Sequence, residues 1–260
     1  EINIKNVDII FNSLHGKGGE DGFAQSYFEY LKIPYTHSGV LSSMNAMNKV
    51  ISKEIFIKNK ILTPNYFLIM NKITNLNKIV KLMKIKKIKF PVVIKPINEG
   101  SSIGVKICKN LLNLKKEVNL LLNKYNQLIL EQFIGGQEIQ VAVMNNKALG
   151  AIELKPKRYF YDYKAKYTKS AKTIHIMPAL VKKFDYKKVL KISEKTHRVL
   201  RCRGVTRSDF KFYKGKFYIL EINTQPGMTN LSLVPEIARY KGITFKDLVS
   251  KITKDASVNK

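Results

Sequence analysis

The sequence contains little of several residue types that mark particular classes of protein. Its 260 residues include no tryptophan, two cysteines, and 19 Asp and Glu against 47 Lys and Arg. Two cysteines, Cys108 and Cys202, are too few for a disulfide framework and fit a reducing compartment, so we expect a cytoplasmic protein. No apolar run approaches the roughly 20 residues that cross a bilayer, so we expect no membrane-spanning helix.

The shortage of acidic residues leaves a formal charge of +28, which by itself favours nucleic acid or an anionic membrane surface as a partner. The excess is mostly Lys, and Ile and Asn are also abundant, as in proteins encoded by AT-rich genomes. Basic stretches such as Lys81–Lys89 carry no aromatic residues for stacking on bases. We therefore expect no specific nucleic-acid partner, and we expect the positive field to favour an anionic substrate such as a nucleotide.

The hydrophobic content of 45% can fill a sizeable core, and strand-like and helix-like stretches alternate as in an α/β protein. We expect a short buried strand leading into a loop at Val7–Gly16, and one helix across Leu41–Lys60. The other strands are expected at Asn65–Met70, Pro91–Lys95, Gly104–Ile107, Leu128–Gln132, Ile139–Met144, Ala148–Glu153, Val205–Phe212 and Lys216–Ile222. The other helices are expected at about Glu20–Ile33, Asn75–Lys87, Asn113–Tyr125, Tyr186–Leu200 and Leu231–Lys251.

Polar side chains gather on the last predicted hairpin. Glu221 and Asn223 end an apolar strand and share one face, and Arg207 and Asp209 share a face of the neighbouring strand. Burying an unpaired carboxylate costs several kcal/mol, so a compensating group is needed. A hard cation such as Mg²⁺ is one possibility, since it prefers oxygen ligands. A salt-bridge network and a solvated strand end are the alternatives.

The length of the hairpin turn decides whether the carboxylates can meet. A two-residue turn, Lys214-Gly215, would place Asp209 opposite Leu220, on the other face from Glu221. A β-bulge or an odd loop length would restore the pairing. We expect a three-residue loop that ends with Gly215 in the left-handed conformation.

A loop rich in glycine and serine follows the strand Pro91–Lys95. Small residues in Asn98–Gly104 let backbone N–H groups and hydroxyls approach phosphate oxygens, and Lys95 adds a positive charge. The loop is not a Walker A motif, because no Gly-Lys-Ser or Gly-Lys-Thr ends it. In the stretch Leu128–Glu138, strand-edge backbone groups could bind adenine and Glu138 could bind ribose, although an ordinary strand and turn would look the same.

Several stretches together resemble the ATP-grasp carboxylate–amine ligases, and among these the D-alanine–D-alanine ligases. They read LHGKGGEDG, IPYTHSGVLSSMNAMNK, FPVVIKPINEGSSIGV, EQFIGGQE, YDYKAKY, CRGVTRSDF and LEINTQPGMTNLSLVPEIA. The resemblance covers nearly the whole chain. It implies an α/β (α+β) ATP-grasp fold with a partial N-terminal α/β domain (1–48), a central domain (49–138) and a C-terminal catalytic domain (139–260).

The resemblance also implies a reaction and a nucleotide site. ATP, with Mg²⁺ or Mn²⁺, phosphorylates the carboxylate of one D-alanine, and the amine of a second D-alanine displaces the phosphate to give a peptidoglycan precursor. Lys49 and Lys95 would contact the nucleotide phosphates. The adenine and ribose would be held by Glu131, Phe133, Ile134 and Glu138. The metal would be held by Asp209, Glu221 and Asn223.

By the same resemblance, Arg207 and the Gly227 N–H face the charge on the tetrahedral centre. The second D-alanine would meet His15, Ser232 and Leu233. A lid within Tyr159–Lys169 would close over the site and exclude water, which an acyl phosphate requires. In that lid Lys166 would reach the γ-phosphate, and Tyr167 would point towards Ser101. We also expect a homodimer.

Two features depart from the family pattern. Asn48 stands where the family usually has Asp, and we expect a small effect. The family begins with a further strand and a Gly-rich loop that carry a Glu for the first D-alanine, and nothing before Val7 resembles them. We therefore expect this chain alone to bind ATP but to ligate D-alanine poorly. The alternatives are a sister ligase making another dipeptide or a depsipeptide, and a non-catalytic basic binding protein on the same fold.

Overall fold

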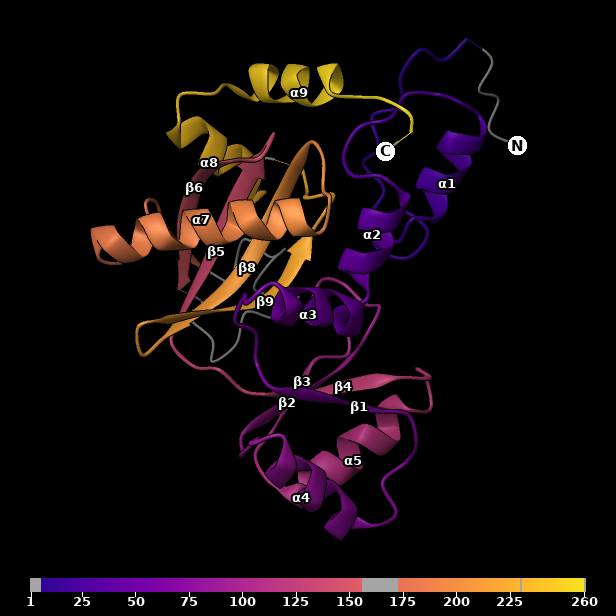
Figure 1. Cartoon of the computed structure of the whole chain (residues 1–260), viewed down its shortest axis with the longest axis vertical. Helices are drawn as coiled ribbons and strands as arrows, with labels where there is room; N and C mark the ends of the chain where they lie inside the picture. Colours follow the sequence, from indigo (N-terminus) through magenta and orange to yellow (C-terminus); the bar gives the residue numbers. More distant parts are fainter. Residues whose placement is uncertain (1–5, 156–172, 230, 260) are drawn as a thin grey trace.

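The computed structural model describes residues 6–155, 173–229 and 231–259. Two antiparallel sheets lie one above the other along the long axis, with helix α3 (Lys49–Lys58) between them (Figure 1). Helices α1 (Phe23–Tyr30) and α2 (Val40–Met47) lie to one side of the larger sheet. No helix in these ranges is long and apolar enough to cross a membrane.

The start of the chain differs from the expected buried strand. The segment Val7–Gly16 forms no strand, because its backbone-to-backbone pairing with a neighbour is confined to a bridge between Ile10 and Tyr35. A strand needs a partner along its length to satisfy its backbone groups. Ile9 is accordingly 42% exposed.

The expected helix across Leu41–Lys60 is also wrong, because Asn48 divides it into α2 and α3. The Asn48 side chain accepts hydrogen bonds from the backbone N–H groups of Val50 at 3.0 Å and Ile51 at 3.2 Å. A side chain that satisfies the first free N–H groups of a helix favours a helix start at that position. Asn and Asp cap helices about equally well, so the departure from the family pattern preserves this cap.

The smaller sheet has the strand order β1-β4-β2-β3 and two helices on one face (Figure 1). Its strands are β1 (Tyr66–Ile69), β2 (Val92–Pro96), β3 (Lys106–Cys108) and β4 (Leu128–Gln132). The helices are α4 (Leu76–Ile85) and α5 (Leu111–Leu121). Val92, Ile94 and Leu130 pack with Leu114 and Val118 in one core. This packing fixes β2, which delivers Lys95 to its end.

The larger sheet has the order β7-β6-β5-β8-β9 and is covered on both faces. Its strands are β5 (Gln137–Met144), β6 (Lys147–Lys155), β7 (Ile174–Ile176), β8 (Val205–Tyr213) and β9 (Lys216–Asn223). Val141 of β5 packs with Val189 of α7 (Lys183–Val199), and Phe56 of α3 joins the same core. Alternate residues face α8 (Leu233–Tyr240) and α9 (Phe245–Lys254) on the other side. The tail therefore forms two helices, with Gly242 at φ 75° ending the first.

The β8–β9 hairpin has a two-residue turn and a bulge. Tyr213 pairs with Lys216, and both turn residues have positive φ, Lys214 at 48° and Gly215 at 72°. Such turns match the twist of the flanking strands. The expected three-residue loop is therefore wrong. A register shift beyond the turn leaves Leu220 unpaired and restores the expected pairing of Asp209 with Glu221.

Candidate active site

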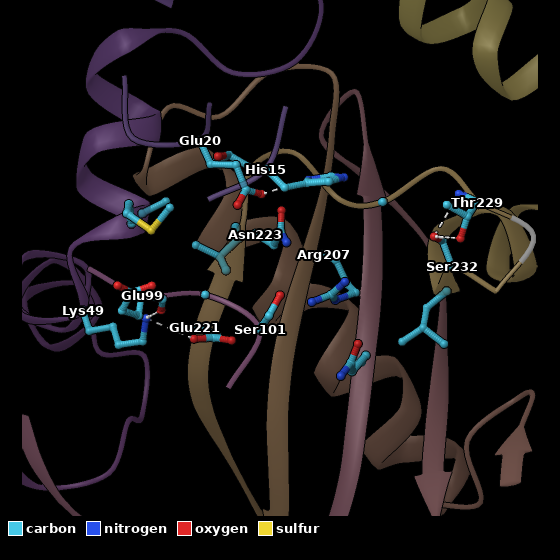
Figure 2. A pocket seen from close by; sticks show the side chains of 18 of the residues that line it. His15, Glu20, Lys49, Glu99, Ser101, Arg207, Glu221, Asn223, Thr229 and Ser232 are labelled. Carbon is cyan, nitrogen blue, oxygen red and sulfur yellow. Dashed lines mark hydrogen bonds and ion pairs between the residues drawn. The ribbon is translucent and has the colours of Figure 1, made fainter. Parts of the chain in front are cut away.

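A cavity of about 240 Å³ lies where the N-terminal segment meets the larger sheet (Figure 2). His15 and Glu20 line one side, Lys49, Glu99 and Glu221 another, and Thr229 and Ser232 the opposite side. Nine of the expected site residues line it: His15, Lys49, Ser101, Arg207, Glu221, Asn223, Gly227, Ser232 and Leu233.

A second cavity of about 90 Å³ lies between the two sheets. The remaining expected residues within the described ranges line it: Lys95, Glu131, Phe133, Ile134, Glu138 and Asp209. Lys49, Glu99 and Glu221 line both cavities. The two cavities therefore meet at one ammonium group and two acidic residues.

Arg207 and Asp209 form a bidentate ion pair. Arg207 Nε lies 2.8 Å from Asp209 Oδ1, and a terminal guanidinium nitrogen lies 3.2 Å from Oδ2. This contact agrees with the salt-bridge interpretation, but it does not exclude a cation, since each carboxylate oxygen keeps a second lone pair. Asp209, Glu221 and Asn223 together offer two carboxylates and one amide oxygen. Among the described residues no group of three or more His, Cys, Asp or Glu side chains is placed to hold a metal ion. The set Asp209, Glu221 and Asn223 has only two residues of these types, because its third member is an asparagine.

Lys49 connects the Gly/Ser loop to β9. Its ammonium group donates to the backbone carbonyl of Glu99 and lies 3.5 Å from Glu221 Oε2. Burial lowers the pKa of Lys49, and the nearby Glu221 carboxylate opposes this effect. The group lies where the two cavities join, which suits a contact with phosphate oxygens.

Glu131 is held differently from the expected adenine ligand. Its Oε1 lies 3.2 Å from the ammonium groups of both Lys53 and Lys95. Burial alone would raise the pKa of Glu131, but the two ammonium groups outweigh burial and hold the pKa below its usual value. Lys53 was not among the residues predicted from the sequence, although it follows Lys49 by one helical turn and so lies near it on α3.

Glu138 also has a partner that the sequence did not reveal. Its Oε2 lies 2.9 Å from Lys211 Nζ on the neighbouring strand β8. The two residues pair directly in the β5–β8 register, so cross-strand neighbours explain the contact.

The loop that bears His15 is tied to the larger sheet by a buried amide network. Asn12 Nδ2 donates to Gln225 Oε1 at 2.7 Å, and Gln225 donates to the Leu14 carbonyl. The backbone N–H of Gln225 donates to Asn223 Oδ1 at 2.8 Å. His15 Nδ1 lies 3.6 Å from Glu20 Oε1, and this close contact with the Glu20 carboxylate is the main cause of a raised His15 pKa. Gln225 and Glu20 were not among the residues predicted from the sequence, since their contacts span distant segments or a loop.

Gly227 leaves room for the start of α8. A Cβ at this position would lie 2.9 Å from Ser232 Oγ, which is too close. Ser232 Oγ accepts from the Thr229 N–H at 3.0 Å. Glycine therefore lets the Gly227 backbone approach both Ser232 and whatever fills the cavity.

Comparison with known proteins agrees with this arrangement. The family model described as "D-ala D-ala ligase C-terminus" matches residues 56–254. The chain belongs to the D-alanine–D-alanine ligase family. It is 59% identical to a D-alanine–D-alanine ligase of Pelagibacter ubique, over 97% of this chain and 82% of that protein. It is 44% identical to a ligase of Geotalea uraniireducens, over 97% of this chain and 79% of that protein.

Solved structures show the same family fold. The D-alanine–D-alanine ligase of Bacillus anthracis in complex with ATP matches with a TM-score of 0.82 at 33% identity, over 96% of this chain and 80% of that chain. A second structure of the Bacillus anthracis ligase matches with a TM-score of 0.85. The expected α/β ATP-grasp fold is confirmed. The domain boundaries at residues 48 and 138 stay predictions.

Two residues of the D-alanine–D-alanine ligase pattern, Lys166 and Tyr167, lie outside the described residues, as does the expected lid across Tyr159–Lys169. Ser101, the expected neighbour of Tyr167, lines the larger cavity with a positive φ of 51°. The lid and its contacts stay predictions.

Proposed function

We propose that the chain ligates two D-alanines to D-alanyl-D-alanine, using ATP and passing through an acyl phosphate. The observation that carries the proposal is the junction of two cavities at Lys49, Glu99 and Glu221. The residues that line the smaller cavity suit a nucleotide, and those that line the larger one suit two small amino acids. The product would serve peptidoglycan precursor synthesis.

The first step transfers the γ-phosphoryl group. A carboxylate oxygen of the first D-alanine attacks the γ-phosphorus, the bond to the bridging oxygen breaks, and ADP leaves. Such a reaction depends on positioning and charge neutralisation more than on covalent help from the protein. Lys49 and Lys95 supply positive charge at the phosphate end. Asp209, Glu221 and Asn223 would hold Mg²⁺ or Mn²⁺, which would neutralise further charge on the phosphate oxygens.

The second step forms the peptide bond. The amine of the second D-alanine attacks the acyl carbon and loses a proton, and phosphate leaves. The oxygen of the tetrahedral centre becomes negative, and Arg207 and the Gly227 N–H line the cavity where that charge would develop. Ser232 and Leu233, at the start of α8, would meet the carboxylate of the second substrate, and His15 would lie near it. A lid with Lys166 and Tyr167 would protect the acyl phosphate from water.

An ADP-release assay with D-alanine, L-alanine and D-lactate tests the proposal. We expect release with D-alanine above the background measured with ATP alone, accompanied by a dipeptide detectable by mass spectrometry. Release that requires D-lactate together with D-alanine would instead indicate a depsipeptide ligase. ATP binding without release for any of these substrates would contradict the ligase activity. The homodimer and the cytoplasmic location are further proposals, which sedimentation and cell fractionation would test.

A further inference from the structure

Lys53 is a buried charged residue that the proposed reaction leaves without a role. It lies on α3 between the two sheets (Figure 1) and is 0% exposed. Its ammonium group lies 3.2 Å from Glu131 Oε1 and donates to Thr63 Oγ1 at 2.6 Å. A buried ammonium is costly unless it is paired and hydrogen-bonded, so this group is held for a reason.

The charges around Glu131 do not cancel. One carboxylate lies between two ammonium groups, those of Lys53 and Lys95, so the trio carries one net positive charge. Lys95 lines the nucleotide cavity, whereas Lys53 has no exposed surface from which to touch a ligand. The net charge of the trio therefore reaches the cavity through Lys95.

Without Lys53 the balance would change. Glu131 and Lys95 would form a neutral pair next to the cavity, and the attraction of Lys95 for a phosphate group would be largely cancelled. Glu131 would also lose one of the two ammonium groups at its Oε1, which would leave the carboxylate paired with Lys95.

We propose that Lys53 is a positioning residue that neutralises Glu131, so that Lys95 keeps its charge and its place for the nucleotide phosphates. The inference rests on the proposed function, because it concerns the phosphate end of the same nucleotide site.

The second contact of Lys53 reaches the larger sheet. Thr63 Oγ1 accepts from Lys53 and donates to the Ile219 carbonyl of β9 at 2.8 Å. The Ile219 N–H in turn donates to the Leu62 carbonyl at 2.9 Å. The Lys53 ammonium also lies 5.6 Å from the centre of the Tyr66 ring. Lys53 is thus fixed from both sheets, and its position relative to Lys95 follows from that packing.

The test compares ATP with adenosine, which lacks phosphates. The variant Lys53→Met removes the charge at similar side-chain length, and Lys58→Met makes the same change at an exposed position on the same helix. We expect Lys53→Met to weaken ATP binding by about tenfold or more and to leave adenosine binding nearly unchanged, since only phosphate contacts depend on Lys95. The binding constants are measured by calorimetry with Mg²⁺ and without D-alanine, with adenosine as a competitor. Lys58→Met should change neither.

A second variant separates charge balance from packing. In Lys53→Met combined with Glu131→Gln, Lys95 again carries one unopposed charge, so ATP affinity should recover towards that of the unaltered chain. This double variant also leaves no unpaired buried carboxylate, so it serves if Lys53→Met does not fold. Equal weakening for ATP and adenosine, unchanged ATP binding in Lys53→Met, or no recovery in the double variant would each overturn the inference. If the unaltered chain binds neither ligand, the proposed function fails instead.

Discussion

Asp209 and Glu221 lie directly opposite each other on β8 and β9, and a β-bulge at Leu220 puts them in register. Like charges placed opposite each other on a sheet are destabilising unless other groups compensate them. Here each carboxylate has a cation: Arg207 holds Asp209, and Lys49 lies 3.5 Å from Glu221. The bulge changes the direction of the β9 side chains at the junction of the two cavities, and β-bulges are common next to active sites.

The proposed metal site predicts the effect of Glu221→Gln. The variant keeps the shape of the side chain but removes a charged oxygen ligand, so we expect turnover to fall by about a hundredfold. Saturation by Mg²⁺ should also require a higher concentration. Initial rates of ADP release at varied Mg²⁺ measure both effects. Lys216→Gln, at an exposed position on the same strand, is the control. Normal turnover of Glu221→Gln at limiting Mg²⁺ would remove Glu221 from the metal site.

The amide network predicts that Gln225→Leu weakens D-alanine binding. Gln225 ties the loop that bears His15 to Asn223, and its loss removes one hydrogen-bond acceptor from each of the buried amides of Asn12 and Gln25. We expect a loss of about 1–3 kcal/mol in the free energy of unfolding. We also expect a higher KM for D-alanine with little change in the KM for ATP. Gln137→Leu, at a partly exposed amide on β5, is the control. A KM for ATP that rises in parallel would show a general loss of structure.

The pair of His15 and Glu20 predicts a shift in titration. The Glu20 carboxylate, 3.6 Å from the ring, favours the protonated imidazole and so raises the pKa of His15. Glu20→Gln should therefore lower that pKa, because the neutral amide no longer stabilises the cation. NMR titration of the His15 ring measures the change. Asp21→Asn neutralises the next residue, whose carboxylate binds the N–H groups of Gly18 and Phe23, and should have a smaller effect. An unchanged His15 pKa in Glu20→Gln would contradict the contact.

The buried imidazole of His197 predicts acid sensitivity. Burial is the main cause that lowers the pKa of His197 to about 4. The folded state therefore keeps the ring neutral, while the unfolded state binds a proton below pH 6.5, the ordinary pKa of a histidine. Stability should be full above pH 6.5 and fall by about 3 kcal/mol in total as the pH approaches 4.

Urea unfolding at pH 7 and pH 4.5 measures this contribution. His197→Gln cannot take up the proton, so it should lose less stability between the two pH values than the unaltered chain. Thr206→Val removes the hydrogen-bond partner of His197, at 2.8 Å, but keeps the ionisable ring, so its acid-induced loss should persist. Equal acid-induced losses in His197→Gln and in the unaltered chain would assign the effect to other groups.

Local patterns in the sequence were enough to predict most helices and strands and the kinds of residue at the site. Alternating and helical apolar patterns predicted the strands of both sheets except the short edge strand β7, and most helices, because burial on one face imposes a period on the chain. The spacing of Arg207 and Asp209, and of Glu221 and Asn223, placed each pair on one face of its strand. The resemblance to the ligase family added roles that no pattern supplies.

How these residues meet depends on the tertiary structure. A three-residue turn and a bulged strand would each place Asp209 opposite Glu221, so the sequence could not distinguish them. The structure has the bulge, at Leu220. The contacts of Lys53 with Glu131 and of Gln225 with Asn12 join segments far apart in the chain. The spacing of apolar residues along the chain does not indicate such contacts, since they form only when α3 and the N-terminal loop pack against the two sheets. The strand expected at Val7–Gly16 is absent for a similar reason. An apolar stretch becomes a strand only where a neighbouring segment pairs with it along its length, and here the pairing is confined to one bridge.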